Sequence, residues 1–304
     1  MDAFPLYHLP LVAMEHVLCM MNPFQLIELS KTSFRFKRAV RSFSRIRPKF
    51  RIDLGIRHQP NIVILGTNDS WTYSWATIFK CSNYPMEELR KMHDHIKEVL
   101  RSPLETLYYK LELFPSENKS ITDWLRSQHE SVHHLELVCY TEGFDDDLKY
   151  LVSGLKITGK LYLLVTKYEE NFQIEIPESP SHLKLSHSSF ISYEQFLTLR
   201  HPKITLHRSI LTDQKINHFL KSWMSCESHL ELKLFEISTS GPEAKDVIMD
   251  VPHEVTTEPS VVIMLNEKFE FSNIKCGYNI KRSDGKAATV CFGNLRDLLY
   301  MIIN

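Results

Sequence analysis

Glycine is scarce in this sequence, with nine residues in a chain of 304. Loops that cradle phosphate groups need glycine, because only a backbone without a side chain can approach the phosphates closely. Complete G-x-G-x-x-G, G-x-x-x-x-G-K-[ST] and G-x-S-x-G motifs are absent, and so are the H-R-D and D-F-G motifs of protein kinases. The sequence therefore gives no support for nucleotide-binding, kinase or α/β-hydrolase chemistry. A catalytic Ser, His and Asp scattered along the chain stays open at this stage.

Closely spaced cysteines are also lacking. No two of the six cysteines form a C-x-x-C pair, and the nearest two lie fifteen positions apart. Dense cysteines are typical of short secreted chains with disulfide frameworks, and paired cysteines are typical of structural zinc sites. The spacing therefore predicts free thiols in a reducing compartment, without a zinc site built on cysteine.

A strong net charge and a membrane segment are missing as well. The formal net charge is −1 and the pI is near 6.9, so the whole molecule carries no strong field for nucleic acid or acidic membranes. Residues 1–5 lack the basic start of a signal peptide, and the apolar stretch 11–21 is too short to span a bilayer. We therefore expect a soluble intracellular protein, cytoplasmic or nuclear, with about two domains.

The N-terminal part of the chain predicts three short helices. The first covers the apolar stretch 11–21, whose large side chains recur at helical spacing. Asn22 then supplies an N-cap, and Pro23 takes the first helical position, where its missing N–H costs nothing. Thr32 or Ser33 caps the third helix, whose apolar side chains face one way: Phe36, Val40 and Phe43.

One strand and one helix alternate through the second half of the chain. Strands of similar composition recur at intervals of 26, 22, 21 and 26 residues, beginning at Leu135, Leu161, Leu183, Ile204 and Leu230. Helical patterns lie between several of them, at 147–152, 193–199 and 213–223. One strand plus one helix every 20–29 residues is the period of leucine-rich repeats, in which parallel strands line one side and helices the other. We predict a divergent leucine-rich-repeat-like solenoid, since the usual asparagine ladder is absent.

Further elements precede this repeat. Residues 61–65 predict a strand and residues 85–102 predict a helix that the following proline ends. A second helix is expected over 120–128, because Ser120 and Asp123 resemble the start of a capping box.

The C-terminal part returns to β structure. The polar stretch 238–259 predicts a loop. Asp284-Gly285 between the runs 277–282 and 287–292 predicts a β-hairpin. After Asn294 the apolar spacing favours a short helix, although a strand also fits. The predicted fold class is therefore α/β, with three N-terminal helices, a divergent solenoid and a C-terminal hairpin.

Residues 4–43 resemble an F-box. The pattern of Leu-Pro, spaced aliphatics and Leu-Ile-x-Leu-Ser appears as Leu9-Pro10, Val17-Leu18 and Leu26-Ile27-Glu28-Leu29-Ser30. Downstream, the chain resembles the type-2 F-box-associated domain through two segments, Leu211 to Trp223 and Arg282 to Val290. The resemblance implies an F-box domain at 1–48 and an associated substrate-binding domain at 49–304.

The resemblance also implies a function. An F-box binds a Skp-type adaptor of a cullin-RING ubiquitin ligase, and the associated domain then presents a protein substrate. On this view the chain is a non-catalytic receptor, for which we expect no cofactor, no metal, no membrane and no nucleic acid. Two other classes stay open, a nucleic-acid binder and a scaffold protein that assembles no ligase.

A unit of about 40 residues is too small to bury all of its apolar side chains internally. Some of them must therefore face a partner or pack on the following domain. The predicted adaptor-binding side chains are Pro5, Leu6, Leu9, Pro10, Val17, Leu18, Pro23, Phe24, Leu26 and Ile27. On the repeat strands, outward-pointing residues between inward aliphatics are the predicted substrate contacts, namely Glu136, Lys184, Thr205 and Glu231.

Three other features have alternative interpretations. The stretch 31–51 has nine basic and no acidic residues, which fits a nucleic-acid patch, a solvated helix face or steering toward an acidic adaptor. The pairs His93-x-His95 and His133-His134 invite a metal hypothesis, but residues i and i+2 of a helix point apart. An aromatic cluster is either core or the edge of a binding surface: Trp71, Tyr73 and Trp75.

Overall fold

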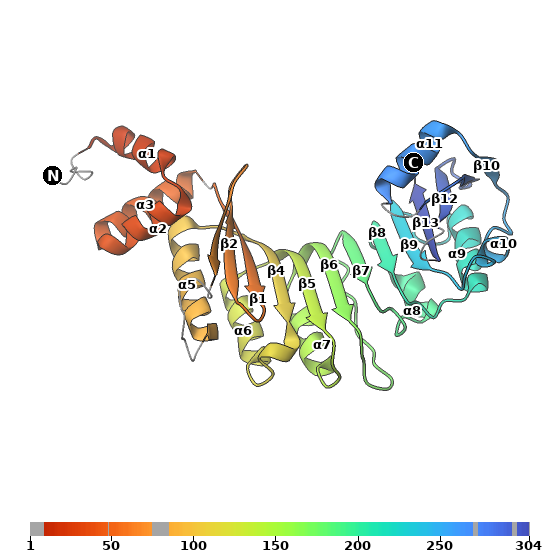
Figure 1. Ribbon diagram of the computed structural model, residues 1–304, viewed down its shortest axis with the longest axis horizontal. Helices are drawn as coiled ribbons and strands as arrows, with labels where there is room; N and C mark the ends of the chain where they lie inside the picture. The colour runs from red at the N-terminus through yellow and green to blue at the C-terminus, as the bar shows by residue number, and fades with distance from the viewer. Residues whose placement is uncertain (1–8, 48, 75–84, 270–272, 294–296, 304) are drawn as a thin grey trace.

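The computed structural model describes residues 9–47, 49–74, 85–269, 273–293 and 297–303. Within these residues the fold is mixed α/β, as predicted, with one large sheet and helices packed on it. Figure 1 shows three N-terminal helices at one end of the molecule and a β-rich C-terminal part at the other. Both ends rise on the same side, so the sheet follows an arc between them.

The three N-terminal helices are α1 (Leu11–Met20), α2 (Pro23–Thr32) and α3 (Phe34–Ile46). Their starts follow the predicted chemistry. Asn22 forms a reciprocal capping box with Gln25, with Oδ1 of Asn22 2.9 Å from the Gln25 amide. Ser33 caps α3 and accepts a hydrogen bond from the Phe36 amide at 3.3 Å. The capping residues therefore fix where these helices begin.

The remaining described helices lie between or after the strands. They are α5 (Pro85–Leu100), α6 (Asn118–Gln128), α7 (Asp145–Gly154), α8 (Tyr193–Thr198), α9 (Asp213–Met224), α10 (Ala244–Ile248), α11 (Pro259–Lys268) and a 3₁₀ turn at Leu111–Leu113. The predicted helices at 85–102, 147–152, 193–199 and 213–223 are thus confirmed.

The described strands form one thirteen-stranded sheet in the order β10-β11-β12-β13-β9-β8-β7-β6-β5-β4-β1-β2-β3. Their bounds are β1 (Arg51–Ile56), β2 (Asn61–Leu65), β3 (Ser70–Ser74), β4 (Leu104–Lys110), β5 (Val132–Cys139), β6 (Ile157–Val165), β7 (His182–Leu185), β8 (Lys203–Leu206), β9 (Leu234–Ser238), β10 (Glu254–Thr256), β11 (Gly277–Lys281), β12 (Ala287–Gly293) and β13 (Leu298–Ile303). Strands β1 and β4 to β9 run parallel, and both ends of the sheet are antiparallel.

Four of the five predicted repeat strands share one register. Leu135, Leu161, Leu183 and Ile204 pair side by side and are fully buried. The fifth prediction, a strand beginning at Leu230, is wrong. Strand β9 begins at Leu234, and its Phe235 pairs with Ile204 in the buried row. After α9 the backbone passes through two residues with positive φ, Cys226 at 61° and His229 at 51°, and these turns delay the strand.

Two further expectations need correction. Helix α6 begins at Asn118 and not at Ser120, because the buried Asn118 side chain accepts a hydrogen bond from the Tyr109 hydroxyl at 2.7 Å. Residues 298–303 form strand β13 and not a helix, because they pair with both β12 and β9. The stretch 238–259 contains α10 and β10 besides loop. The C-terminal hairpin of β11 and β12 is confirmed.

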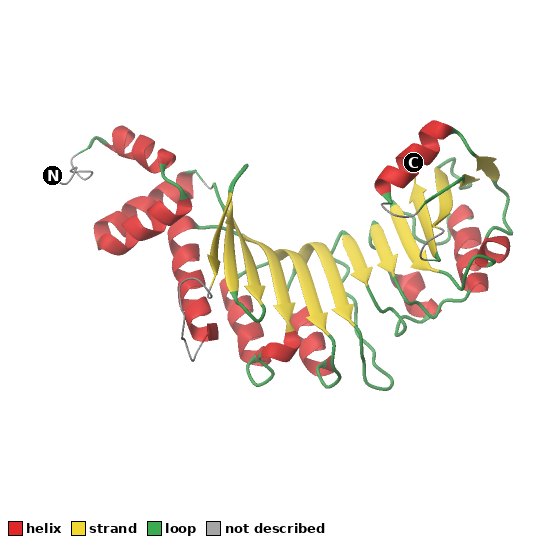
Figure 2. Cartoon of the chain, in the orientation of Figure 1, coloured by secondary structure: helices red, strands yellow, loops and turns green. Residues whose placement is uncertain are grey.

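The helices that follow the parallel strands cover one face of the sheet. Figure 2 shows them along the outer side of the arc, with the strands on the inner side. Side chains alternate along each strand, so the leucine row packs under the helices while the next row faces away. Strand β6 shows this alternation directly, with Leu161, Leu163 and Val165 buried and Tyr162 and Leu164 only half-buried.

This alternation predicts unequal effects of two neighbouring leucines on stability. Leu163→Ala removes a fully buried side chain, so we expect a loss of about 2–5 kcal/mol in the free energy of unfolding. Leu164→Ala on the opposite face should cost about 1 kcal/mol or less, because that side chain is only partly buried. Urea unfolding followed by circular dichroism measures both changes. Equal losses in the two variants would contradict the assignment of the faces.

Candidate functional site

The predicted adaptor contacts fall into three groups. Pro5 and Leu6 lie outside the described residues. Pro10 is exposed, and Leu9, Val17 and Phe24 are half-buried. The other four are buried in the chain's own core: Leu18, Pro23, Leu26 and Ile27.

Burial of that last group has a physical cause. Helices α2 and α3 pack against each other and against α5, so their apolar sides join the core of the following domain. The ring of Phe24 also lies 4.5 Å from that of Tyr73 in β3. In this conformation the four buried side chains are inaccessible to a partner, and their part in docking stays a prediction. Packing on the following domain, the alternative considered from sequence, accounts for the position of the α2 residues, whereas Leu18 of α1 joins the same core beside α3.

Helix α1 contrasts with α2 and α3. Its sequence LVAMEHVLCM is apolar on nearly every side, yet Leu18 alone among its described side chains is fully buried. A helix that is hydrophobic all round is usually buried on most sides. Large apolar side chains of the three-helix unit are instead exposed: Val12 (66%), Met20 (78%), Phe34 (79%) and Ile46 (67%). The absence of an amphipathic pattern in 11–20 was the sequence signal that could have identified Val12 and Met20.

Much of the basic stretch 31–51 is engaged by the chain itself. Lys37 and Arg41 pair with Glu98 of α5, at 2.7 and 3.7 Å. Arg51 pairs with Glu105 at 3.3 Å. These contacts hold α3 and β1 against the following elements, which favours a structural and solvated role for the stretch.

The aromatic cluster is at least partly core. Tyr73 is buried, and burial raises the pKa of its hydroxyl to about 12. Trp71 packs edge-on against Phe50, with ring centroids 5.9 Å apart. Trp75 lies outside the described residues. Tyr73 therefore joins helix α2 to the sheet, and Trp71 packs on the segment between α3 and β1.

Three of the four predicted substrate contacts lie in one row on the helix-free face. The register runs from Glu136 through Tyr162, Lys184 and Thr205 to Glu236. Glu136 and Lys184 are half-buried and reachable from solvent. Thr205 is buried, with its hydroxyl oxygen 3.3 Å from Nε2 of His182.

Glu231 does not belong to this row. It is exposed, but it lies in a turn before β9 begins. Glu236 takes the corresponding position in the row and pairs with His207, with 2.6 Å between the carboxylate and Nε2. The placement of Glu231 on a strand was wrong because the preceding turn is longer than the repeat predicts.

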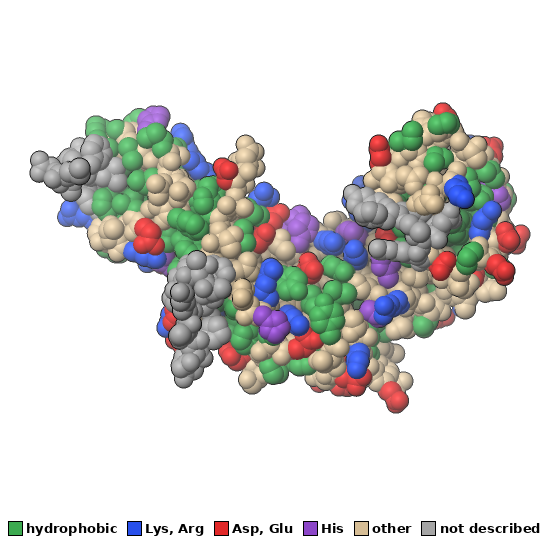
Figure 3. Space-filling model, viewed as in Figure 1, with side chains coloured by type: hydrophobic (Ala, Val, Ile, Leu, Met, Phe, Trp, Pro, Cys, Tyr) green, Lys and Arg blue, Asp and Glu red, His purple; other side chains and the backbone are tan. Residues whose placement is uncertain are grey.

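Basic and histidine side chains gather over the middle of the open face, as Figure 3 shows. His182 on β7 lies in the same row as Lys160 of β6 and Lys203 of β8. Burial lowers the pKa of His182 to about 4, helped by Lys160, Lys203 and Lys184 and opposed by Glu236. Burial and Lys184 also lower the pKa of Lys160. Three lysines thus lie around His182 on the open face, although the whole chain is close to neutral.

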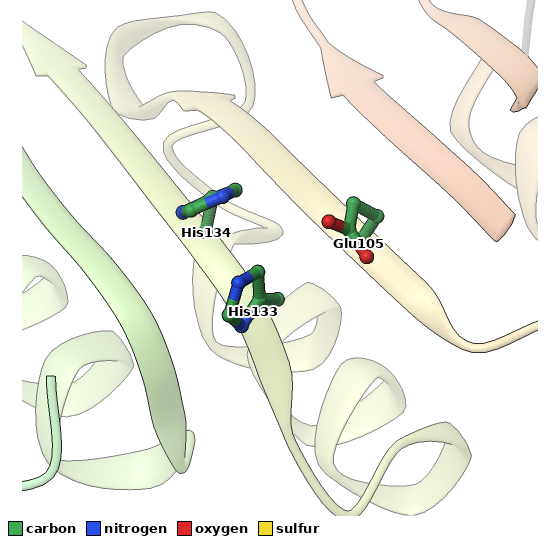
Figure 4. A group of neighbouring side chains, drawn as sticks. All are labelled: Glu105, His133 and His134. Atoms are coloured by element: carbon green, nitrogen blue, oxygen red, sulfur yellow. The ribbon is translucent and has the colours of Figure 1, made fainter. Parts of the chain in front are cut away.

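Glu105, His133 and His134 come together on the sheet and face one another (Figure 4). Strands β4 and β5 are neighbours, and Thr106, the residue after Glu105, pairs with His134. However, Nδ1 of His134 accepts a hydrogen bond from the Lys160 amide at 3.1 Å. The neutral ring therefore carries its proton on Nε2 and has no lone pair left for a metal. Because Arg51 also pairs with Glu105, the geometry favours a hydrogen-bonded cluster over a metal centre.

His93 and His95 point to different neighbours, as helical spacing predicts. Nε2 of His93 lies 2.9 Å from Nε2 of His129, and Nε2 of His95 lies 3.0 Å from the Ser30 hydroxyl. Burial lowers the pKa of His129 to about 3, so this ring is neutral in its pair. Both histidines of α5 therefore connect elements of the core.

Two family models match the chain. A model of the F-box domain matches residues 6–47, and a model described as F-box associated matches residues 171–237. The chain thus contains an F-box domain and an F-box-associated segment, and the F-box range coincides with the three N-terminal helices. The late segment Arg282 to Val290 lies outside the second match. Neither a curated protein nor a solved structure matches the chain.

The structure also bears on the state of the cysteines and on membrane-spanning helices. The five cysteines of the described residues are free thiols, as predicted: Cys19, Cys139, Cys226, Cys276 and Cys291. None of the described helices has the length and apolar character needed to cross a membrane.

The low pKa of His182 predicts that acid weakens the fold. An unfolded histidine takes up a proton near pH 6.5, whereas folded His182 resists protonation down to about 4. The unfolded state therefore binds more protons in this window, and the free energy of unfolding falls as pH drops from 6.5 to 4. NMR titration of the His182 ring should show a midpoint near 4, and His182→Gln should flatten the pH dependence of unfolding. A ring that titrates at 6.5 or above would contradict this placement of His182.

Proposed function

We propose that this chain is a substrate receptor of a cullin-RING ubiquitin ligase. Its F-box docks on a Skp-type adaptor, and the remainder of the chain binds a protein substrate. The chain itself performs no bond chemistry. It raises the effective concentration of a substrate lysine near the catalytic partner of the ligase, inside the cell, in the cytoplasm or nucleus.

The observation that carries the proposal is the exposed apolar helix α1. Protein interfaces use apolar and aromatic anchors that are buried on binding. Helix α1 offers such anchors within a matched F-box domain and has few contacts of its own to the rest of the chain. A partner that covers α1 would bury Val12 and Met20, which water now surrounds.

The proposed adaptor surface accordingly centres on α1 and its entrance. We include the predicted contacts that remain reachable, Leu9, Pro10, Val17 and Phe24, together with Pro5 and Leu6 upstream. Leu18, Pro23, Leu26 and Ile27 would hold α2 and α3 in place beneath that surface.

The remainder of the chain would act as one substrate-binding domain over 49–304, built as a divergent leucine-rich-repeat-like solenoid. The parallel strands β4 to β9 and the helices on one side of them support this description. The open face of those strands is the proposed substrate surface, with Glu136 and Lys184 among its contacts. Its residues lie on strands of a single sheet, which supports a pre-formed binding surface.

Docking through α1 predicts a selective loss of adaptor binding. In the variant Val12→Glu/Met20→Glu, two exposed apolar side chains become charged, so the fold should persist while an apolar interface becomes costly to form. Recovery of a co-expressed Skp-type adaptor should fall at least tenfold relative to the unaltered chain, which corresponds to about 1.4 kcal/mol. Circular dichroism and the unfolding temperature should stay unchanged.

Ile263→Glu provides the matched control. Ile263 is 58% exposed on α11 at the opposite end of the molecule, so its replacement should leave adaptor recovery unchanged. Undiminished recovery in the α1 double variant would reject the proposed docking surface. Failure of the unaltered chain to recover any adaptor would reject the ligase function itself.

A further inference from the structure

Three lysines cluster on the open face of neighbouring parallel strands. Lys160 of β6 and Lys203 of β8 flank His182 in one row, and Lys184 lies in the next row of β7. We call this group, Lys160, Lys184 and Lys203, the lysine patch. It lies midway along the sheet, where the side chains face away from the helices.

Two of these lysines lie against the ring of Tyr162. The ammonium of Lys160 lies 5.0 Å from the centre of the Tyr162 ring, and that of Lys184 lies 4.8 Å from it. A cation over an aromatic face is attracted by the ring quadrupole. Two like charges are thus gathered around one ring, an arrangement that a bound anion would stabilise.

Within the described part of the chain, no acidic side chain pairs with the lysine patch within 4 Å. Among the described residues, Lys160, Lys184 and Lys203 form no salt bridge, whereas Lys37, Lys91 and Lys110 each do. Glu136 raises the pKa of Lys160 from a longer distance, and Glu236 is occupied by His207. The patch therefore keeps an excess of positive charge on a partly desolvated surface.

We propose that the lysine patch binds an extended acidic segment, rich in Asp or Glu, of a partner protein. This inference rests on the proposed substrate-receptor function and names the chemical class of its substrate. Strands in a sheet lie about 4.8 Å apart, so Lys160 and Lys203, two strands apart, span about 10 Å at the backbone. Side chains on one side of an extended peptide repeat every 6.6–6.8 Å, and flexible lysines can reach carboxylates at that spacing.

Flanking carboxylates distinguish an acidic peptide from nucleic acid. Glu136 and Glu236 lie on the same open face at the two sides of the patch, in one row with Tyr162 and Lys184. A long polyanion with charge at every step would meet them and be repelled. A short acidic run with neutral neighbours fits between them.

The cations themselves favour carboxylates over phosphate groups. Lysine ammoniums act as single point charges, whereas arginine offers the planar fork that holds a phosphate by two hydrogen bonds. The patch contains lysines and no arginine. A row of separate carboxylates matches separate ammoniums better than one doubly charged phosphate group does.

The test measures binding of a short fluorescein-labelled peptide with alternating Asp and Ser, by fluorescence anisotropy with the full chain. The same peptide with Asn in place of Asp should not bind. The variant Lys160→Gln/Lys184→Gln/Lys203→Gln should weaken the Asp peptide at least tenfold, and salt should weaken its binding to the unaltered chain.

Lys119→Gln/Lys149→Gln/Lys215→Gln is the matched control. It removes the same charge from helices α6, α7 and α9, and each of these lysines also lies near an aromatic ring, at 5.6, 5.2 and 4.4 Å. Peptide affinity should be unchanged in this variant. Equal weakening by both triple variants, or no binding of the Asp peptide, overturns the inference. Tighter binding of single-stranded DNA or of a phosphoserine peptide at the same lysines also overturns it.

Adaptor recovery separates this inference from the proposed function. The lysine-patch variant should recover as much Skp-type adaptor as the unaltered chain, because the patch lies away from α1. Loss of peptide binding with adaptor recovery intact would assign the patch to the substrate side. If the unaltered chain recovers adaptor but does not bind the acidic peptide, the inference is wrong and the proposed receptor function is unaffected.

Discussion

The parallel hydrogen-bonded ladder of β4 to β9 determines which surfaces this protein can offer. A parallel strand must be reached by a connection that crosses one face of the sheet, and successive connections here cross the same face. Along these strands alternate residues therefore lie in a row under the helices or in a row on the opposite face, most regularly in β6. Leu163 belongs to the first row and Tyr162 to the second, although they are neighbours in the chain. Every candidate substrate contact follows from this division.

The hydrophobic core on the helix side of the sheet also fixes the F-box helices relative to the open face. Helices α2 and α3 are part of one continuous apolar core with α5 and the first strands, and polar contacts support that junction. Lys37 pairs with Glu98, and Ser30 lies against His95. A partner bound to α1 and a partner bound to the open face would thus be kept in a fixed position relative to each other. Fixed geometry of this kind suits a protein that acts by proximity, since a loose tether dilutes the effective concentration.

Local chemistry allowed the sequence to predict most helix starts and most strands. Asn22 and Ser33 each cap a helix at an expected position, because capping depends on a few adjacent residues. The errors arose where distant contacts decide. Asn118 begins α6 early through its bond with Tyr109, and residues 298–303 become a strand because two other strands flank them.

The candidate site shows the same limit. The alternation of side chains along a strand correctly predicted that Glu136 and Lys184 lie on the open face. The burial of Thr205 was not predictable in this way, because the His182 ring beside it comes from a neighbouring strand. Likewise, Leu26 and Ile27 match an F-box motif, yet their burial depends on α5, far along the chain. Residue type and spacing identify which side chains are apolar, whereas tertiary packing decides which of them remain for a partner.

One-sided coverage of the sheet is tested most directly by two adjacent tyrosines of β4. Tyr109 is fully buried on the helix side, and Tyr108 faces the open side, where Arg57 lies 4.5 Å from its ring. Hydroxyl-radical footprinting with mass spectrometry should modify Tyr108 in the folded chain and leave Tyr109 protected. Equal protection of both tyrosines in the isolated chain would contradict the account, because the face assigned to a partner would then already be covered.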